Sequence, residues 1–493
     1  MPARRPHIAA SAAQTELASS LAALRVALEL PGAFPADATA EAERAAASAA
    51  LRLAPPGVVD LTAVLDLTAV EFVTIDPPGT TDLDQALHIG RSPDADAGWR
   101  VRYAIADLPA LVSPGGAVDR EARRRGQTLY AADGRIPLHP PAISEGAGSL
   151  LPDATRTAFV WDFTLDGHGE VQRVSVGRAL VRSRARLSYA EAQAAIDAGT
   201  APESLALLPG VGRARLELER LRGGASLNSP DEEIVLGPDG YRVERRRPLP
   251  VEEWNAQLSL MTGMAAANIM VQGGVGILRT MPAPGEEDFA DFRRQTAALG
   301  LPWPAGQHYG DYLRGLAREN PAALAVLQAA TSLFRGAGYL PFDVERGMPA
   351  PADPVQAAIA APYAHATAPL RRLVDRWSLV ICAALSAGEP VPDWARESLA
   401  QLPAIMGASA RLAAELDAAS LNRVEAAMLR GSVGERFPAT VLSLRGERAR
   451  IQLTEPVVTA ECAAPRHPSP GSVITVVLRS ADIATGSVAF EAV

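Results

Sequence analysis

Residues 72–87 read FVTIDPPGTTDLDQAL, and this stretch places three carboxylates at a predicted junction between a strand and a loop. A strand-like run ends in Asp76, a Pro-Pro-Gly turn follows, and Asp82 and Asp84 stand two residues apart. Only small, polar or apolar residues lie between the three acids, and no Lys or Arg neutralises them. The pattern therefore predicts a cluster of negative charge at one strand end.

The spacing of these acids favours a metal site. Residues two apart in an extended segment point to the same side, so Asp82 and Asp84 are expected to project together, and Asp76 can join them across the turn. Clustered carboxylates are costly unless a cation lies among them, and Mg²⁺ takes carboxylate oxygens while keeping water for substrate phosphates. The same acids could instead cap turns and a helix start near Asp84. The third acid and the Pro-Pro turn favour the metal.

A second segment, YAHATAPLRR, runs from Tyr363 to Arg372 and combines a predicted helix start with two arginines. Pro369 suits the first turn of a helix, and a helix N-terminus attracts phosphate. Arg371 and Arg372 would add positive charge there. Alone, the segment is equally consistent with a plain helix start carrying solvated arginines.

Two further side chains, Tyr130 and His365, allow a structural as well as a functional interpretation. Tyr130 follows a basic run and could stack on a nucleic-acid base, or it could be a core tyrosine. His365 is predicted to be structural, because no two of the seven histidines have the spacing of metal ligands.

Composition limits the class of protein. At 493 residues the chain is expected to form two to four domains. It contains no lysine, so its 47 basic residues are arginines, and its net charge of −9 argues against a general nucleic-acid coat. An enzyme whose arginines gather in a channel remains compatible with that charge. Cys382 and Cys462 make neither a disulfide framework nor a zinc site. The arginines cluster locally at Arg120, Arg123, Arg124 and Arg125; at Arg182, Arg184 and Arg186; at Arg245, Arg246 and Arg247; and at Arg371 and Arg372.

The patterning predicts an α+β protein with three parts. Residues 1–58 read as a small helical domain, of which a helix-turn-helix is one form. Residues 59–430 begin with strands and continue, from 188–222 and 251–340 onward, with helical spacing. Residues 431–493 contain five short strands, which suit a small OB-type barrel. No signal peptide or 18-residue uncharged apolar run is present, so we expect a cytoplasmic protein without membrane contact.

In this order and spacing, these motifs resemble the ribonuclease II family, also called the RNB-domain family. Its acid motif T-I-D-x(5)-D-x-D-D-A-L corresponds here to Thr74–Asp76 followed by Asp82–Leu87, and its Y-A-x-x-T-S-P-I-R-[RK] motif to Tyr363–Arg372. The resemblance covers about residues 60–430. Further matching blocks are Tyr103–Asp107, Val118–Ala122, Tyr130, Ile136–Leu138, Gly148–Leu150 and Ser226–Asp231.

The resemblance implies a processive 3′-to-5′ exoribonuclease that hydrolyses single-stranded RNA to nucleoside 5′-monophosphates. By position, Asp76, Asp82 and Asp84 would be the metal acids for Mg²⁺, with Mn²⁺ as an alternative, and Asp84 would be the acid most directly tied to catalysis. Arg371 would hold the scissile phosphate. The RNA-binding residues would be Tyr130, stacking on the 3′-terminal bases, together with Arg371, Arg372 and Tyr363. A monomer is implied, and DNA is not expected as a substrate.

The chain departs from the family pattern in three places. Gln85 replaces the fourth acid, so a second metal ion is expected to bind more weakly, and a weakened or inactive RNA-binding relative is the main alternative function. The helical residues 1–58 stand where the family usually has two cold-shock barrels, which predicts a relaxed need for a single-stranded overhang. Ala368 replaces the usual Ser before Pro369. An unrelated core behind a helix-turn-helix regulator would require the whole resemblance to be accidental.

Overall fold

A curved sheet lies at the centre of the computed structural model, which describes residues 10–49, 64–92, 98–225, 231–237, 240–246, 248–317, 320–331, 333, 335–453, 455–456, 458–464 and 469–493. Its six strands follow the order β1-β8-β2-β3-β4-β7. The long strand β8 pairs parallel with β2 at one end and antiparallel with β7 along the rest, so the sheet curls back on itself. The bounds are β1 Leu65–Asp66, β2 Phe72–Asp76, β3 Gln85–Arg91, β4 Trp99–Ala106, β7 Thr155–Leu165 and β8 Val171–Ser188.

Helices cover this sheet and bury the main core. The core joins aromatic side chains of the sheet, such as Trp161, to apolar side chains of the helices, such as Leu258 and Trp377. The chain thereby buries a large apolar area, which is the dominant favourable contribution to folding. The covering helices are α4 Tyr189–Asp197, α5 Glu203–Arg222, α6 Pro250–Gly273, α10 Leu373–Ala387 and α11 Asp393–Ser398.

The face of the molecule beside the acid segment is built from short elements. They include helix α3 Ala117–Arg125, the hairpin of β5 Leu129–Ala131 and β6 Gly134–Ile136, and a π-helical segment Ala142–Ala147. Two-stranded pairs complete the domain: β9 Asp231–Gly237 with β10 Gly240–Arg246, β11 Val275–Thr280 with β12 Gly338–Asp343, and β13 Val355–Gln356 with β14 Ala361–Pro362.

Three helices form a lobe with its own aromatic core. They are α7 Glu286–Ala298, α8 Tyr309–Arg314 and α9 Pro321–Thr331. Phe292, Trp303 and Tyr312 meet in this core, with ring centroids 5.8–6.3 Å apart. Leu442 of the C-terminal barrel belongs to the same cluster, so the lobe contacts the barrel.

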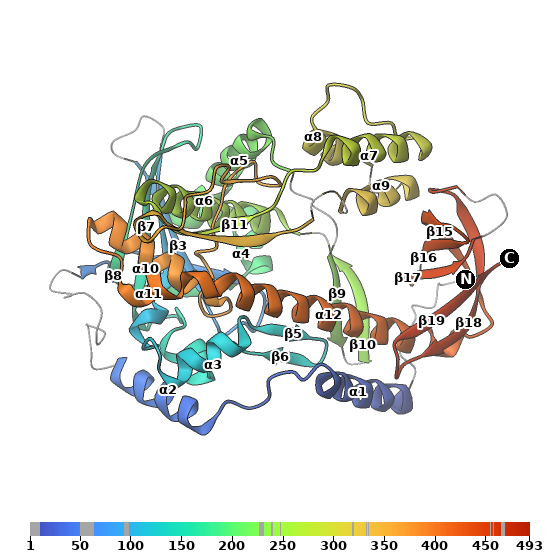
Figure 1. Ribbon diagram of the computed structural model, residues 1–493, viewed down its shortest axis with the longest axis horizontal. Helices are drawn as coiled ribbons and strands as arrows, with labels where there is room; N and C mark the ends of the chain where they lie inside the picture. Colours follow the sequence, from blue (N-terminus) through green and yellow to red (C-terminus); the bar gives the residue numbers. More distant parts are fainter. Residues whose placement is uncertain are drawn as a thin grey trace.

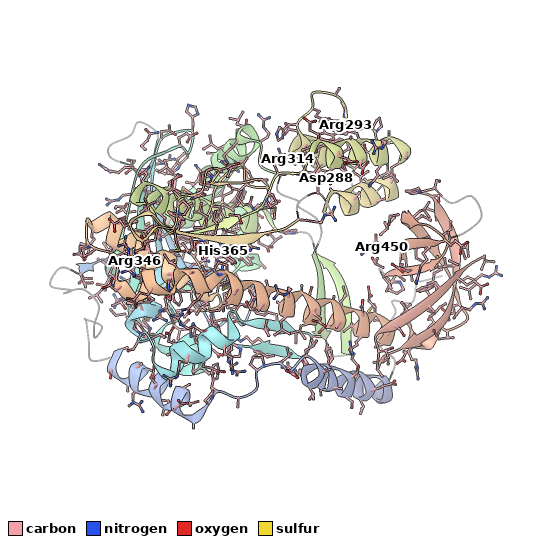
Figure 2. All side chains as sticks on the ribbon, in the orientation of Figure 1. Asp288, Arg293, Arg314, Arg346, His365 and Arg450 are labelled. Atoms are coloured by element: carbon pink, nitrogen blue, oxygen red, sulfur yellow. The ribbon has the colours of Figure 1, made fainter. Side chains whose placement is uncertain are left out.

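The C-terminal part is a closed barrel of five strands in the order β15-β16-β17-β19-β18, which confirms the predicted OB-type barrel. The long helix α12 Leu402–Leu429 runs from the central domain to this barrel (Figure 1). In the view of Figure 2, His365 lies in the middle of the central domain and Arg450 on the edge of the barrel nearest to it. The strands are β15 Arg436–Arg445, β16 Arg448–Leu453, β17 Thr459–Ala463, β18 Val473–Asp482 and β19 Ser487–Ala492.

The two N-terminal helices pack on different parts of the protein. Helix α1 Ala10–Ala27 lies along the end of α12, where Leu17 and Leu21 join Val424 and Ile483 in one cluster. Helix α2 Ala36–Ala49 packs on α3 and the π-helical segment. Each helix is therefore stabilised by the rest of the chain, not by a core that the two share in the described residues.

Local signals misplaced two features. Residues 251–340 were expected to be helical, but β11 and β12 pair there, because the apolar run of β11 is short and fully buried. Pro369 was expected inside the first turn of a helix, but α10 begins at Leu373. Asp84 directly precedes strand β3, so the alternative in which it caps a helix start does not apply. In the part of the chain that the structure describes, no helix is long and apolar enough to cross a membrane.

Candidate active site

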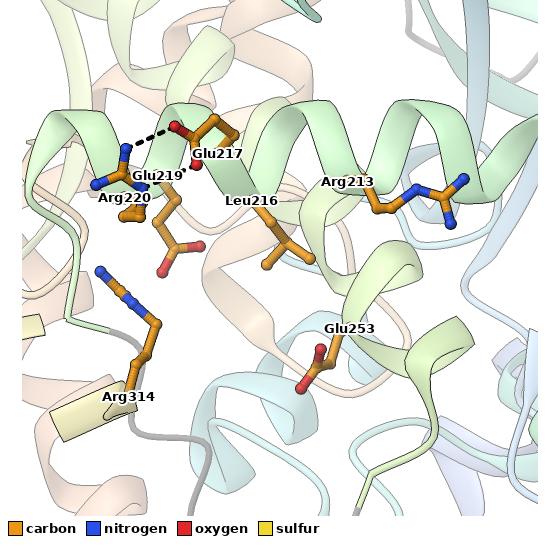
Figure 3. Close-up of a pocket in the computed structure, with 7 residues that line it drawn as sticks. All are labelled: Arg213, Leu216, Glu217, Glu219, Arg220, Glu253 and Arg314. Carbon is orange, nitrogen blue, oxygen red and sulfur yellow. Dashed lines mark hydrogen bonds and ion pairs between the residues drawn. The ribbon is translucent and has the colours of Figure 1, made fainter. Parts of the chain in front are cut away.

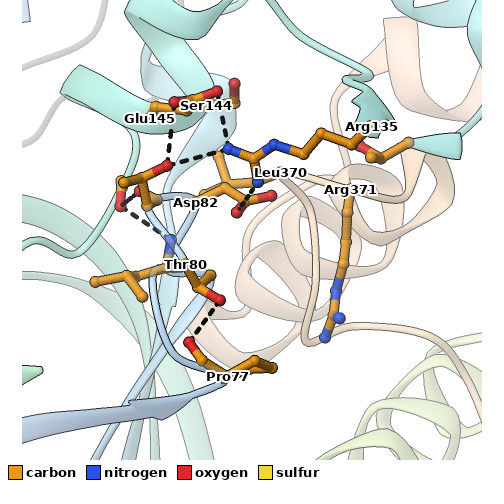
Figure 4. A network of polar contacts seen from close by, with 12 residues as sticks. Pro77, Thr80, Asp82, Arg135, Ser144, Glu145, Leu370 and Arg371 are labelled. Atoms are coloured by element: carbon orange, nitrogen blue, oxygen red, sulfur yellow. Dashed lines mark hydrogen bonds and ion pairs between the residues drawn. The ribbon is translucent and has the colours of Figure 1, made fainter. Parts of the chain in front are cut away.

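The acid segment forms at the end of the second sheet strand. Strand β2 ends at Asp76, and Gly79 reverses the chain with a φ of +81°, a conformation that glycine adopts without a steric penalty. The turn is closed by the Thr80 hydroxyl, which donates to the Pro77 carbonyl at 2.9 Å (Figure 4). Leu83 is fully buried between Asp82 and Asp84, and the two acids are close enough for the charge of Asp82 to act on Asp84.

Asp84 is held by the segment that carries Arg371. Its Oδ1 accepts a hydrogen bond of 2.7 Å from the backbone N–H of Leu370, and its Oδ2 lies 3.3 Å from Nε of Arg371. Asp84 is only 4% exposed, whereas the Arg371 side chain is 47% exposed. The pair therefore joins a buried carboxylate to a guanidinium that solvent, or a ligand, can reach.

Burial makes two of the acids reluctant to ionise. It raises the pKa of Asp84 to about 8, although Arg371 and the Leu370 N–H lower it. It also raises the pKa of Asp76 to about 7, and the charge of Asp82 adds to both shifts. Burial disfavours the charged form of both carboxyl groups, and the positive charge of Arg371 does not fully offset this effect.

Asp82 has a partner that the sequence did not reveal. Arg135, on strand β6, forms an ion pair with Asp82 and a second one with Glu145 at 2.9 Å. It also donates to the Thr81 hydroxyl at 3.0 Å, so the hairpin is tied to the acid segment (Figure 4). Asp82 and Arg135 are 53 positions apart, and no local pattern connects them.

Both the NH2 group and the oxygen of the Gln85 side-chain amide form hydrogen bonds within the protein. Its Nε2 donates to the Thr367 carbonyl at 2.7 Å, and its Oε1 accepts a hydrogen bond from the Tyr103 hydroxyl. The fourth position of the acid motif therefore connects strand β3 to the segment before Arg371.

Tyr130 is exposed beside these groups. It lies on strand β5, is 55% exposed, and is close enough to Arg371 and Asp82 for their charges to act on its hydroxyl. An exposed aromatic ring next to a guanidinium and carboxylates is an available stacking surface.

Arg372 and Tyr363 lie in the wall of the site and not at an open surface. Arg372 makes a bidentate ion pair with Asp375, at 3.0 and 2.9 Å. Tyr363 is 9% exposed and packs on Gly263, where an added Cβ would lie 2.2 Å from its ring. His365 accepts or donates a 2.8 Å hydrogen bond at Nδ1 with the Tyr339 hydroxyl, in agreement with a structural role.

Three arginines of the basic run before Tyr130 form ion pairs within their own helix. Arg124 and Arg125 both pair with Glu121, and Arg123 pairs with Asp119. These ion pairs stabilise helix α3. The side chains of Arg245–Arg247 lie outside the described residues.

The acids can hold a divalent ion only with the help of ligands from outside the protein. Among the described residues, no three His, Cys, Asp or Glu side chains come together as a ready-made metal cluster. Mg²⁺, however, commonly needs only one or two carboxylates, with water and substrate phosphate as its other ligands. The raised pKa values of Asp76 and Asp84 indicate carboxyl groups that a cation would help to ionise. The donor set fits an ion of this kind, with Asp82 already engaged by Arg135.

A separate pocket of about 300 Å³ lies between α5, α6 and α8, and none of the three acids lines it (Figure 3). It is lined by Leu216 and charged side chains, and Arg220 pairs with Glu217 at 2.6 Å within it. The arginine and glutamate side chains that line this pocket balance one another in charge. The acid segment, and not this pocket, is therefore the candidate active site.

Comparison with known families fits this geometry. The model of the RNB domain matches residues 64–384, and the model of the RNase II-type exonuclease C-terminal S1 domain matches residues 435–493. The chain belongs to the RNB family. Both parts of the match agree with the central domain and the barrel described above.

This RNB protein is similar to curated relatives and to solved structures, of which two each are described. It is 28% identical over 327 residues to exosome complex exonuclease RRP44 homolog A of Arabidopsis thaliana, covering 63% of this chain and 34% of the relative. It is 27% identical over 328 residues to ribonuclease R of Escherichia coli, covering 63% of this chain and 39% of that protein. The chain thus spans about a third of the length of these curated relatives.

The structures agree in fold. RNase R of Mycoplasma genitalium, in complex with ribose methylated single-stranded RNA, matches 97% of this chain and 78% of its own with a TM-score of 0.83 at 14% identity. Yeast Ssd1, a pseudonuclease, matches 81% of this chain and 50% of its own with a TM-score of 0.64 at 17% identity. The fold therefore occurs in proteins with and without nuclease activity. Whether this chain is a nuclease has to be argued from the residues of its site.

Proposed function

We propose that this RNB protein is a processive exoribonuclease that shortens single-stranded RNA from the 3′ end and releases nucleoside 5′-monophosphates. The observation that supports this most directly is the pair of Asp84 and Arg371, a buried carboxylate 3.3 Å from a solvent-accessible guanidinium. A carboxylate buried at this cost beside a cation is characteristic of a functional site.

The proposal gives each side chain a role in binding and positioning. Asp76 and Asp84 would hold a divalent ion, Mg²⁺ or Mn²⁺, with Asp82 contributing charge next to them. Bound there, such an ion would supply a water of lowered pKa and positive charge near the scissile phosphate. Arg371 would bind the phosphate oxygens and stabilise the charge that develops on them, since a guanidinium forms bidentate bonds with phosphate.

The remaining residues would orient the RNA and the arginine. Tyr130 would stack on a terminal base, whereas Arg372 and Tyr363 would support the segment that carries Arg371. The burial of Tyr363 and the ion pair of Arg372 favour support over direct RNA contact.

A catalytically weakened RNA-binding protein is the second candidate, because Gln85 brings no charge to the fourth acid position. The hydrogen bonds of Gln85 inside the protein do not add support for this candidate, because Asp76, Asp84 and Arg371 are present although the fourth acid is not. A binding module would have no physical need for two buried, reluctant carboxyl groups.

The test uses a 5′-labelled single-stranded RNA with Mg²⁺, incubated with the wild-type chain or the Asp84→Asn variant and resolved on a denaturing gel. We expect conversion to mononucleotides and a very short labelled core, lost in the variant by about 100-fold or more. The asparagine can still accept the Leu370 N–H, so the fold is retained. Tight RNA binding in EDTA with no shortening by either protein would support the binding module instead.

A further inference from the structure

Gln85 links two segments that must be aligned for the site to work. It directly follows Asp84 at the start of strand β3, and its amide reaches the Thr367 carbonyl at 2.7 Å. Thr367 lies four positions before Arg371. The amide therefore spans from the strand of the acid to the segment of the arginine.

The orientation of this amide is determined by its partners. A backbone carbonyl can only accept, so the Nε2 group has to face Thr367. The Tyr103 hydroxyl donates to Oε1 from strand β4, and burial keeps the pKa of Tyr103 well above its ordinary value, so the donor stays protonated. An ionised carboxylate at position 85 would face the Thr367 carbonyl with no hydrogen to donate, which places two acceptors against each other.

The segment that Gln85 contacts is anchored on several sides. The Thr367 hydroxyl shares a 2.7 Å hydrogen bond with Ser259 of helix α6. The N–H of Ala368 donates to Asp375 at 2.7 Å, and the N–H of Leu370 donates to Asp84 at 2.7 Å. Gln85 and Asp84 are thus two adjacent contacts between β3 and this segment.

We propose that Gln85 is a positioning residue that fixes the alignment of Asp84 with Arg371, and not a metal ligand that has lost its charge. The proposal rests on the exonuclease function proposed above. It has a consequence opposite to the family pattern: restoring an acid at position 85 breaks the contact with Thr367 and weakens the site.

The experiment compares Gln85→Asp, Gln85→Glu and Gln85→Ala with the wild-type chain. The glutamate keeps the length and Oε1 of glutamine but loses the donor, whereas the aspartate introduces the acid of the family motif. Gln172 is an exposed glutamine of strand β8 whose Nε2 donates to Asp166 at 3.0 Å, and Gln172→Glu and Gln172→Ala are the matched controls.

Three quantities are measured for each variant. They are kcat and KM on a single-stranded RNA, the number of Mn²⁺ ions bound per chain in the absence of RNA by electron paramagnetic resonance, and the melting temperature in EDTA. We expect all three Gln85 variants to lower kcat by about tenfold or more while KM changes by less than about threefold. The number of bound Mn²⁺ ions should stay at the wild-type value, and the melting temperature should fall relative to the Gln172 controls.

Two results would overturn the proposal. One is a Gln85→Asp variant with kcat at or above the wild-type value, or with an additional Mn²⁺ ion per chain. The other is a set of Gln85 variants with unchanged melting temperatures, which would mean that the contact with Thr367 contributes nothing.

The outcome is separable from that of the proposed function. If the wild-type chain shortens no RNA, the exonuclease function fails, and the melting temperatures and Mn²⁺ count still decide whether Gln85 bridges the two segments. If the wild-type chain is active and Gln85→Asp is faster, the function stands and the positioning role is refuted.

Discussion

Arg135 of the β5–β6 hairpin forms an ion pair with Asp82, the second of the three acids, which lies in the loop after strand β2. The Asp82 side chain is 9% exposed, so Arg135 is its partner in a largely buried ion pair. A positive side chain thus occupies the place beside Asp82 that a metal ion alone was expected to fill. The pairing also ties the hairpin that carries Tyr130 to the acids.

We expect Arg135→Ala to destabilise the metal-free protein by about 1–3 kcal/mol, because it leaves a largely buried carboxylate without a partner. Added Mg²⁺ should recover part of this loss, since a divalent ion can supply the missing charge. Urea unfolding with EDTA and with Mg²⁺ measures both effects. Arg120→Ala is the control, because Arg120 and Asp37 are 64% and 65% exposed and such pairs contribute little. A loss that is the same with and without Mg²⁺ would contradict the charge-replacement argument.

The stability that Asp76 and Asp84 contribute to the metal-free protein should fall as the pH rises from about 4 to about 8. Asp76 and Asp84 have pKa values of about 7 and about 8 when folded, against 3.8 as the ordinary value, so the folded state keeps protons that the unfolded state has released. Stability decreases with pH wherever the folded state binds more protons. His139, whose pKa burial lowers to about 3, acts in the opposite direction, but only below the ordinary histidine value of 6.5.

Divalent ions should reverse this trend, because they bind the deprotonated carboxylates and compete with protons. Melting temperatures measured from pH 6 to pH 9 should therefore show a larger gain from Mg²⁺ at about pH 8 than at about pH 6. The Asp84→Asn variant should lose most of the dependence above pH 7. A metal-free protein that becomes more stable between about pH 7 and 8 would rule out the raised pKa values.

Tyr130→Ala should weaken the binding of short single-stranded RNA by about 5- to 150-fold, which corresponds to about 1–3 kcal/mol for one stacked base. Tyr130→Phe keeps the ring and should bind nearly as well as the wild type. Binding can be followed in EDTA with a fluorescent base analogue at the 3′ end, whose emission is quenched on stacking. Equal binding by the alanine and phenylalanine variants would show that no base stacks on this ring.

The sequence predicted the parts of this site that depend on local spacing. Leu83 between Asp82 and Asp84 enters the core, and the charge of Asp82 acts on Asp84, in keeping with the predicted proximity of the two acids. The barrel was predictable from local sequence as well, since five short strand-like runs follow one another with turn residues between them. These features are encoded within short windows of the chain.

The features that escaped prediction depend on contacts between distant segments. Gln85 and Thr367 are 282 positions apart, and nothing near either residue indicates that they meet. Pro369 suits a helix start, but the turn from Ala368 is held by Asp84 and Asp375, and α10 begins only at Leu373. Tertiary hydrogen bonds here override a local preference.

The N-terminal helix α1 should influence RNA binding through the same hairpin. Arg25 makes a bidentate ion pair with Asp133 at the tip of the hairpin, at 2.6 and 3.0 Å, and Leu24 joins Leu129 and Ile136 in one apolar cluster. The hairpin is thus held by α1 on one side and by the acid segment, through Arg135, on the other.

A double-mutant cycle of Arg25→Ala and Asp133→Ala tests this coupling. We expect an interaction free energy of about 1 kcal/mol in unfolding, because both side chains are more than two-thirds buried and the pair is bidentate. Arg25→Ala should also raise KM for short RNA about two- to threefold without changing kcat, since it loosens the Tyr130 ring and leaves Asp84 and Arg371 in place. The exposed pair of Arg220 and Glu217 on α5 is the control, and its removal should leave KM unchanged. Additive stabilities together with an unchanged KM in Arg25→Ala would show that α1 covers the hairpin without holding it.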